Sequence, residues 1–272
     1  ALPGLIDAHA HLRDPGFEYR EDIVSGTRAA ARGGFTAVAA MPNTIPVADS
    51  APVIRYMIEK AGQAGYCRVL PIGAVTKGQK GEEIAEIGFM AEAGAVAFSD
   101  DGKPVSAAGI VRTAIEYASY FDRVVISHCE DLSLAAGGVI NEGIVSTEMG
   151  LRGIPSIAED IQIDRDTRIA EYSGLPVHIA HVSTANGVEI IRQAKARGVK
   201  VTAETCPHYF TLTEEAVRGF HTMAKVNPPL REESDRLAVI EGLRDGTLDM
   251  IVTDHAPHHE DEKDCEFSLA NN

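Results

Sequence analysis

The chain has 272 residues, of which 44% are hydrophobic, and its 25 basic and 40 acidic residues give a formal charge of −15. This length and apolar content can build one large core, while the negative charge argues against a nucleic acid or an anionic membrane surface as a partner. No apolar run approaches the roughly 18 residues that cross a membrane, and no signal peptide is visible. We therefore expect a small-molecule substrate and a cytoplasmic location.

Four cysteines are scattered along the chain without a CxxC pair: Cys67, Cys129, Cys206 and Cys265. This usage favours free thiols in a reducing compartment. Cys129 directly follows His128, so a thiolate ligand is conceivable. Side chains alternate along a strand, however, and this would turn Cys129 away from its neighbour. We expect Cys129 to be a small buried apolar residue.

Apolar runs alternate with amphipathic segments along the whole chain. The strand-like runs are Leu2–Ala8, Phe35–Met41, Arg68–Val75, Ala95–Phe98, Val124–Ser127, Val177–His181, Val199–Glu204 and Leu248–Thr253. The helix-like segments, with apolar positions three and four residues apart, include Asp49–Ala61, Glu82–Ala93, Ile110–Tyr120, Ala158–Tyr172 and Val188–Ala196. Short apolar strands separated by helices predict a parallel sheet covered on both faces.

Eight such strands predict an α/β fold, a (β/α)8 TIM-type barrel of the metal-dependent hydrolase type, forming one catalytic domain over residues 1–272. An open doubly wound sheet is the alternative, but no glycine-rich phosphate loop follows the first strand. The chain does not begin with methionine, and no helix follows its last strand before Asn272. We therefore expect a barrel that is truncated at both ends.

In a barrel of this kind the active site lies at the carboxyl ends of the strands. Metal-ligand types follow the expected strand ends here: His9, His11, Asp101, His128, His181 and Asp254. One tetrahedral zinc cannot use so many ligands, whereas a pair of divalent ions can. His9, His11 and Asp254 would hold one ion, His128 and His181 the other, with Asp101 as the bridge. Taken singly, each residue could instead be a core histidine or a capping aspartate.

Asp254 also has a predicted catalytic role. Its carboxylate is placed to take a proton from the attacking water and to pass that proton to a leaving nitrogen. Arg13 lies two residues beyond His11, so we expect it on the same side of the strand and facing the same site. Its forked guanidinium group suits a substrate carboxylate, although a salt bridge at the rim is the alternative.

Seven motifs carry a family resemblance. They are Asp7–Gly16, Met41–Thr44, Phe98–Gly102, Ser127–Glu130, His181–Thr184, Asn227–Arg231 and Thr253–His258, the last followed by Lys263. In this order they resemble the bacterial dihydroorotases of the amidohydrolase superfamily. The resemblance implies interconversion of N-carbamoyl-L-aspartate and L-dihydroorotate in pyrimidine biosynthesis, with one or two zinc ions. It also implies that Arg13 and Asn43 hold the substrate carboxylate, while Asn227 and His258 seat the ring.

Two departures from the family pattern matter. Many relatives bridge the metals with a carboxylated lysine, but the stretch from Ala97 to Asp101 has no lysine before Lys103. This fits the subgroup with a bridging aspartate, for which Asp101 matches better than Asp100, and we expect weaker binding of the second ion. The family's small β-domain and last helix are also missing from the chain.

Other functions stay open from the sequence. Hydantoinases and allantoinases share the fold and the cyclic-amide chemistry. A non-catalytic barrel that serves as a scaffold for aspartate carbamoyltransferase is a further alternative. We expect a homodimer, with association with aspartate carbamoyltransferase left open. His178 lies three residues before His181 and should face away from the site, as a structural residue.

Overall fold

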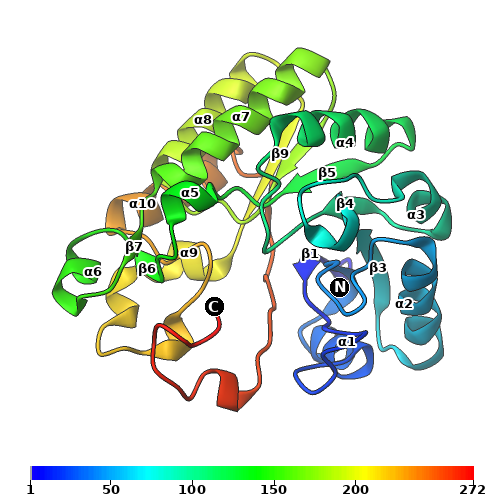
Figure 1. Cartoon of the computed structure of the whole chain (residues 1–272), viewed down its shortest axis with the longest axis horizontal. Coiled ribbons are helices and arrows are strands. Elements are labelled where there is room, and N and C mark those ends of the chain that lie inside the picture. Colours follow the sequence, from blue (N-terminus) through cyan, green and yellow to red (C-terminus); the bar gives the residue numbers. More distant parts are fainter. Residues whose placement is uncertain (1) are drawn as a thin grey trace. The chain divides into compact units, whose positions relative to one another are not determined.

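The computed structural model describes residues 2–272. Two compact units form the chain. Unit 1 comprises the residues up to Ser127 together with Val252–Pro257, and unit 2 comprises His128–Ile251 together with His258–Asn272. Each unit is a layer of parallel strands packed with helices (Figure 1). No helix among residues 2–272 has both the length and the apolar character needed to span a bilayer.

Unit 1 contains five parallel strands that pair in chain order. They are β1 (Leu5–Ala10), β2 (Phe35–Ala40), β3 (Arg68–Gly73), β4 (Ala97–Ser99) and β5 (Val124–Ser127). The helices between them are α1 (Ile23–Arg32), α2 (Ala51–Ala64), α3 (Ile87–Ala93) and α4 (Ala108–Tyr120), with a 3-10 turn η1 (Lys77–Gln79). Val38, Ile72 and Phe98 are fully or almost fully buried and form part of the core beneath the helices.

Local sequence explains where the helices of unit 1 begin and end. Asp22 caps α1, because its side chain accepts a hydrogen bond from the backbone of Ser25 at 2.6 Å while the Ser25 hydroxyl accepts from the Asp22 backbone at 3.1 Å. The α2 helix begins with a proline in its first turn, where the missing N–H costs nothing. Gly94 ends α3 with a left-handed φ of 112°, which suits glycine.

Unit 2 contains three adjacent parallel strands, β8 (Val177–Ile179), β9 (Val201–Thr205) and β10 (Met250–Ile251). Its main helices are α7 (Ile157–Ser173), α8 (Ala185–Ala196), α9 (Pro207–Thr211) and α10 (Glu233–Asp245). Helices α7 and α8 pack side by side (Figure 1). Short 3-10 turns η2 (Glu214–Val217), η3 (Thr222–Ala224) and η4 (Glu260–Glu262) complete the unit. Ile163, Ile179 and Ile191 are fully buried between these layers.

A small subdomain of unit 2 was not predicted. It contains α5 (Leu132–Ala135), β6 (Ile140–Asn141), α6 (Ile144–Met149) and β7 (Gly153–Ile154), with β6 and β7 paired in parallel. Each of these elements has two to six residues. Runs of that length are too short to show a helical or strand period in the sequence.

Several predicted strands are shorter in the structure than in the prediction, and two of these end just before predicted site residues. The strand predicted to reach His181 ends at Ile179, and the strand predicted to reach Thr253 ends at Ile251. The backbone turns shortly after both strand ends, where His181 and Asp254 adopt left-handed φ angles of 34° and 48°. Such residues cannot continue a strand. The first strand also differs, since it spans Leu5–Ala10 rather than Leu2–Ala8.

Candidate metal centre

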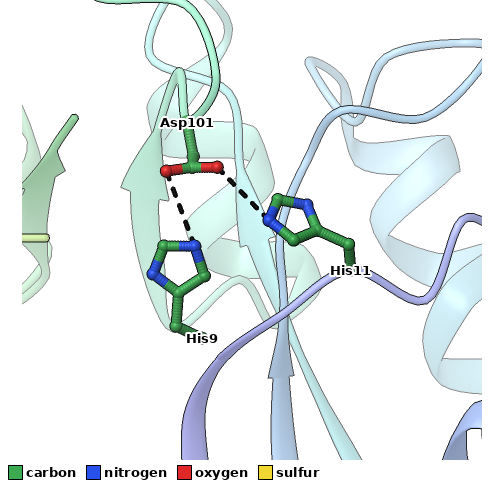
Figure 2. Close-up of side chains that lie close together, drawn as sticks. All are labelled: His9, His11 and Asp101. Carbon is green, nitrogen blue, oxygen red and sulfur yellow. Dashed lines mark ion pairs between the residues drawn. The ribbon is translucent and has the colours of Figure 1, made fainter. Parts of the chain in front are cut away.

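Three predicted ligands of unit 1 converge at the carboxyl ends of β1 and β4 (Figure 2). His9 lies in β1, His11 is the first residue after β1, and Asp101 lies two residues beyond β4. The Asp101 carboxylate spans the two rings, with Oδ1 at 3.5 Å from Nε2 of His9 and Oδ2 at 3.3 Å from Nε2 of His11. All three residues are buried, so polar atoms gather here away from solvent.

Asp254 joins the same cluster from the far end of the sequence. Its Oδ1 lies 3.4 Å from Nε2 of His9 and 3.1 Å from Nε2 of His11. The backbone fixes this approach, because Asp254 N donates to His9 O at 3.1 Å and His11 N donates to His255 O at 2.8 Å. Burial raises the pKa of the Asp254 carboxyl, but the adjacent His9 and His11 outweigh it, so its pKa lies below the ordinary value.

The donor set fits a divalent cation. Ligand atoms of His9, His11 and Asp101 all lie within 4.8 Å of one another, and Asp254 adds a second carboxylate against the same rings. Two buried carboxylates repel each other and lose hydration, so a cation between them would relieve both costs. Imidazole nitrogen with carboxylate oxygen is the donor mixture that zinc and its transition-metal neighbours accept.

Asn43 contacts the predicted ligand His11. Its side-chain oxygen lies 2.8 Å from Nδ1 of His11. An acceptor at this position favours the tautomer with a proton on Nδ1, which leaves the Nε2 lone pair directed toward Asp101 and Asp254. Sequence reasoning assigned Asn43 to the substrate carboxylate and missed this contact, which joins residues 32 positions apart in the chain.

Arg13 follows His11 by two residues, but the prediction that it continues the same strand is wrong. It is not on the strand, because β1 ends at Ala10 and Arg13 adopts a left-handed φ of 62°. Its Nε donates to the backbone oxygen of Pro257 at 3.0 Å, which ties the guanidinium group to the segment after Asp254. The residue is buried, with 6% of its surface exposed.

Three predicted site residues have a strained backbone conformation. Seven described residues other than glycine have a positive φ, and three of them are Arg13, His181 and Asp254. Such a conformation costs on the order of 1–3 kcal/mol for each residue and persists only where the surroundings enforce it. The local hydrogen bonds of these turns therefore matter for the site.

Unit 2 brings together the two remaining predicted histidines. Nδ1 of His128 lies 2.8 Å from Nε2 of His181, and both rings are buried. Nε2 of His128 lies 3.4 Å from Oε2 of Glu130, which also accepts a hydrogen bond from Nδ2 of Asn227 at 3.2 Å. The bridging of this pair by Asp101 stays a prediction.

Glu130 was not predicted as a site residue. Burial raises the pKa of its carboxyl, but hydrogen bonding and charge from His128 outweigh burial, and the resulting pKa is below the ordinary value. The sequence feature that could have identified Glu130 is its position two residues after His128, within the family motif Ser127–Glu130. Asn227 was predicted, and among residues 2–272 its buried side-chain oxygen has no hydrogen-bond partner, as expected of a group that binds a ligand.

The remaining predictions concern single residues of unit 2. Nδ1 of His258 lies 3.3 Å from Oε2 of Glu262, at the start of the segment around η4. His178 lies within hydrogen-bond distance of Thr202 (2.8 Å) and of Glu204 (3.0 Å), which fits the predicted structural role. Cys129 is buried, as predicted.

Comparison with known proteins gives consistent matches. The model of the Dihydro-orotase-like family matches residues 1–187. A curated relative from Acetivibrio thermocellus, named dihydroorotase, is 65% identical over 271 residues, covering 100% of this chain and 64% of its own length. A dihydroorotase from Syntrophotalea carbinolica is 63% identical, with the same coverage of both chains. The chain thus spans 64% of the length of these curated relatives.

Among solved structures, the L-hydantoinase (dihydropyrimidinase) from Arthrobacter aurescens matches with a TM-score of 0.83 and 25% identity. The match covers 96% of this chain and 59% of that one. A D-hydantoinase structure matches with a TM-score of 0.76 and 21% identity. The predicted fold class, an α/β TIM-type fold of parallel strands and helices, is thereby confirmed.

Proposed function

The chain belongs to the Dihydro-orotase-like family, and we propose that it is a cyclic amide hydrolase that interconverts N-carbamoyl-L-aspartate and L-dihydroorotate in pyrimidine biosynthesis. The observation that carries the proposal is the cluster of His9, His11, Asp101 and Asp254 at the carboxyl ends of its strands. Relatives that are 60–65% identical to the chain carry the name dihydroorotase and support this choice of reaction.

The family is metal-dependent, and the chain carries histidine and aspartate groups that suit a metal. We propose zinc, as one or two ions per chain. His9, His11, Asp101 and Asp254 would hold the first ion, and His128 and His181 would hold the second, with Asp101 as the bridge. When bound, such ions polarise an amide carbonyl and lower the pKa of the attacking water.

Asp254 is proposed as the proton carrier. With its pKa below the ordinary value, the carboxylate is ionised at neutral pH and can accept a proton. In ring opening, that proton comes from the water that attacks the carbonyl carbon and goes to the ring nitrogen as the C–N bond breaks. In ring closure the same steps run in reverse.

Four side chains are proposed to bind the substrate. The guanidinium group of Arg13 supplies paired N–H donors for the substrate carboxylate, with Asn43 as its neighbour in this role. Asn227 and His258 are proposed to seat the ring. The Asn227 side-chain oxygen, which is buried and has no hydrogen-bond partner among residues 2–272, supports this role, because an amide N–H of the substrate would satisfy it.

Another cyclic amidohydrolase activity is the second candidate, because the L-hydantoinase from Arthrobacter aurescens has a similar structure at 25% identity. Sequence identity above 60% to proteins named dihydroorotase favours the first candidate. We further propose a cytoplasmic homodimer. A role only as a scaffold for aspartate carbamoyltransferase is disfavoured, since the chain retains all four histidines and both aspartates of the predicted site.

The test is a comparison of substrates. The protein, with all segments that its gene encodes, is loaded with zinc and assayed on L-dihydroorotate, hydantoin and allantoin. We expect turnover of L-dihydroorotate far above that of the other two, and its loss in Asp254→Ala with the fold intact by circular dichroism. Preferred turnover of hydantoin or allantoin would replace the proposed substrate, and an inactive parent without bound metal would contradict catalysis.

A further inference from the structure

Asp7 lies two residues before His9 on β1, and both oxygens of its carboxylate accept hydrogen bonds. Oδ1 accepts hydrogen bonds from the backbone N–H of Thr253 at 3.1 Å and of His9 at 3.3 Å, and Oδ2 accepts from the Thr253 hydroxyl. Only 3% of the surface of Asp7 is exposed. Thr253 immediately precedes Asp254, so one buried carboxylate contacts the backbone of the proposed ligand His9 and of the residue before the proposed ligand Asp254.

We propose that Asp7 is a positioning residue that sets Asp254 and His9 in their ligand geometry before a metal binds. The inference rests on the metal centre proposed above. We call this contact the Asp7–Thr253 clamp, meaning the three hydrogen bonds from Thr253 and His9 to the Asp7 carboxylate.

The clamp holds Asp254 in a strained backbone conformation. Asp254 has a φ of 48°, a left-handed conformation that is uncommon and costly for any residue other than glycine. The Thr253 hydroxyl both donates to Asp7 and accepts from the backbone N–H of His255 at 3.1 Å. Residues on both sides of Asp254 are therefore held through one hydroxyl, and the strained turn cannot relax without breaking these hydrogen bonds.

The same arrangement recurs beside other proposed ligands. Asp100, next to Asp101, accepts from both the backbone N–H and the hydroxyl of Thr76. Glu159 accepts from both the backbone N–H and the hydroxyl of Ser183, two residues after His181. Each case pairs a buried carboxylate with the N–H and hydroxyl of a single Ser or Thr, and each lies within two residues of a proposed ligand. This repetition indicates a positioning device.

The hydroxyl of Thr253 is the group to remove. Thr253→Val keeps the shape of the side chain and the backbone N–H, but it deletes one donor to Asp7 and the acceptor for His255. Thr253→Ser restores the hydroxyl. Thr36→Val is the matched control, because the Thr36 hydroxyl donates to Leu5 O at 3.2 Å at the opposite end of β1 and is exposed.

The measurement is the zinc affinity of each variant, obtained by competition with a chromophoric chelator, with the unfolding temperature recorded with and without zinc. Outer-sphere partners of metal ligands typically contribute about 10–100-fold in affinity, so we expect a loss of that size in Thr253→Val. Thr253→Ser keeps the hydroxyl and should bind zinc with an affinity close to that of the parent, and Thr36→Val should also bind zinc like the parent. Asp7→Asn should also bind zinc more weakly, because an amide cannot accept from all three donors.

Each outcome decides a different claim. Parent-like zinc affinity in folded Thr253→Val or folded Asp7→Asn would overturn the clamp and leave the metal centre standing. Equal losses in Thr253→Val and Thr36→Val would also overturn it, since they would indicate a general effect on β1. If Thr253→Val does not fold, the comparison of Asp7→Asn with Thr253→Ser decides in the same way. A parent that binds no zinc would overturn the proposed centre itself.

Discussion

Nε2 of His11 lies 3.1 Å from Oδ1 of Asp254, although 243 residues separate the two in the chain. A bridge between Ala10 and His255 and the hydrogen bond from His11 N to His255 O bring the late segment against β1. The first motif of the sequence and one of its last are therefore parts of a single unit. The proposed first metal position depends on this return of the chain.

Asn43 should control metal affinity through His11. Removing its oxygen in Asn43→Ala leaves the His11 ring free to change tautomer and orientation. We expect zinc to bind about 10–100-fold more weakly, as for other outer-sphere partners of ligands. Chelator competition measures this, with the exposed His221→Ala as a control. An unchanged zinc affinity together with a raised KM would assign Asn43 to the substrate alone.

Arg13→Lys should weaken substrate binding and leave the chemical step almost unchanged. Lysine keeps the charge but lacks the fork, so one charge-assisted hydrogen bond to the substrate carboxylate is lost. At about 1.5–3 kcal/mol for such a bond, KM for L-dihydroorotate should rise roughly 10–100-fold with little change in kcat. Steady-state kinetics test this against Arg28→Lys on the exposed face of α1. A fall in kcat at unchanged KM would contradict a role in carboxylate binding.

Arg231 should be important for stability. Its guanidinium group is buried, lies 3.3 Å from Glu159, and donates at 3.0 Å both to the Asn141 side chain and to Ile154 O. Arg231→Met would leave the buried Glu159 carboxylate without its cation, which typically costs about 3–5 kcal/mol. Denaturant unfolding should show this loss of stability. Arg168→Met removes an exposed partner of Asp164 and should leave the unfolding midpoint almost unchanged.

Asp22 should stabilise α1 in a pH-dependent manner. The hydrogen bond from the Ser25 backbone is the main cause that holds the pKa of Asp22 below its ordinary value. A lowered folded-state pKa means that the stabilisation is present above the unfolded pKa and is lost as the pH falls through the folded value. Asp22→Ala should therefore lower the free energy of unfolding by about 1 kcal/mol at pH 7. In strong acid the parent and the variant should have the same free energy of unfolding. A gap that does not depend on pH would contradict the cap as its source.

Much of the fold was predictable because strand and helix periods are local properties. The alternation of apolar runs and amphipathic segments predicted the parallel α/β class, which is confirmed. The family that the motifs resemble is also confirmed. Short elements such as β6 and α6 show too little periodicity to be read from the sequence. The left-handed turns at His181 and Asp254, which follow the strands that end at Ile179 and Ile251, were not predicted, because the sequence does not indicate such turns at non-glycine residues.

Within the site, residue types were more predictable than contacts. The four candidate ligands of unit 1 could be proposed from the sequence because histidines and aspartates followed expected strand ends. The contacts of Asn43 with His11 and of Asp7 with Thr253 join residues 32 and 246 positions apart. No local pattern encodes such pairs, since they depend on how the turns after different strands meet.

The most direct test of the central claim is crystallography of the zinc-loaded protein, with anomalous diffraction recorded on both sides of the zinc absorption edge. The account predicts a zinc peak within coordination distance, about 2.0–2.2 Å, of Nε2 of His9, Nε2 of His11 and a carboxylate oxygen of Asp101 or Asp254. A zinc-loaded crystal with no peak among these atoms, or with its strongest peak elsewhere, would contradict the metal centre and the chemistry proposed from it.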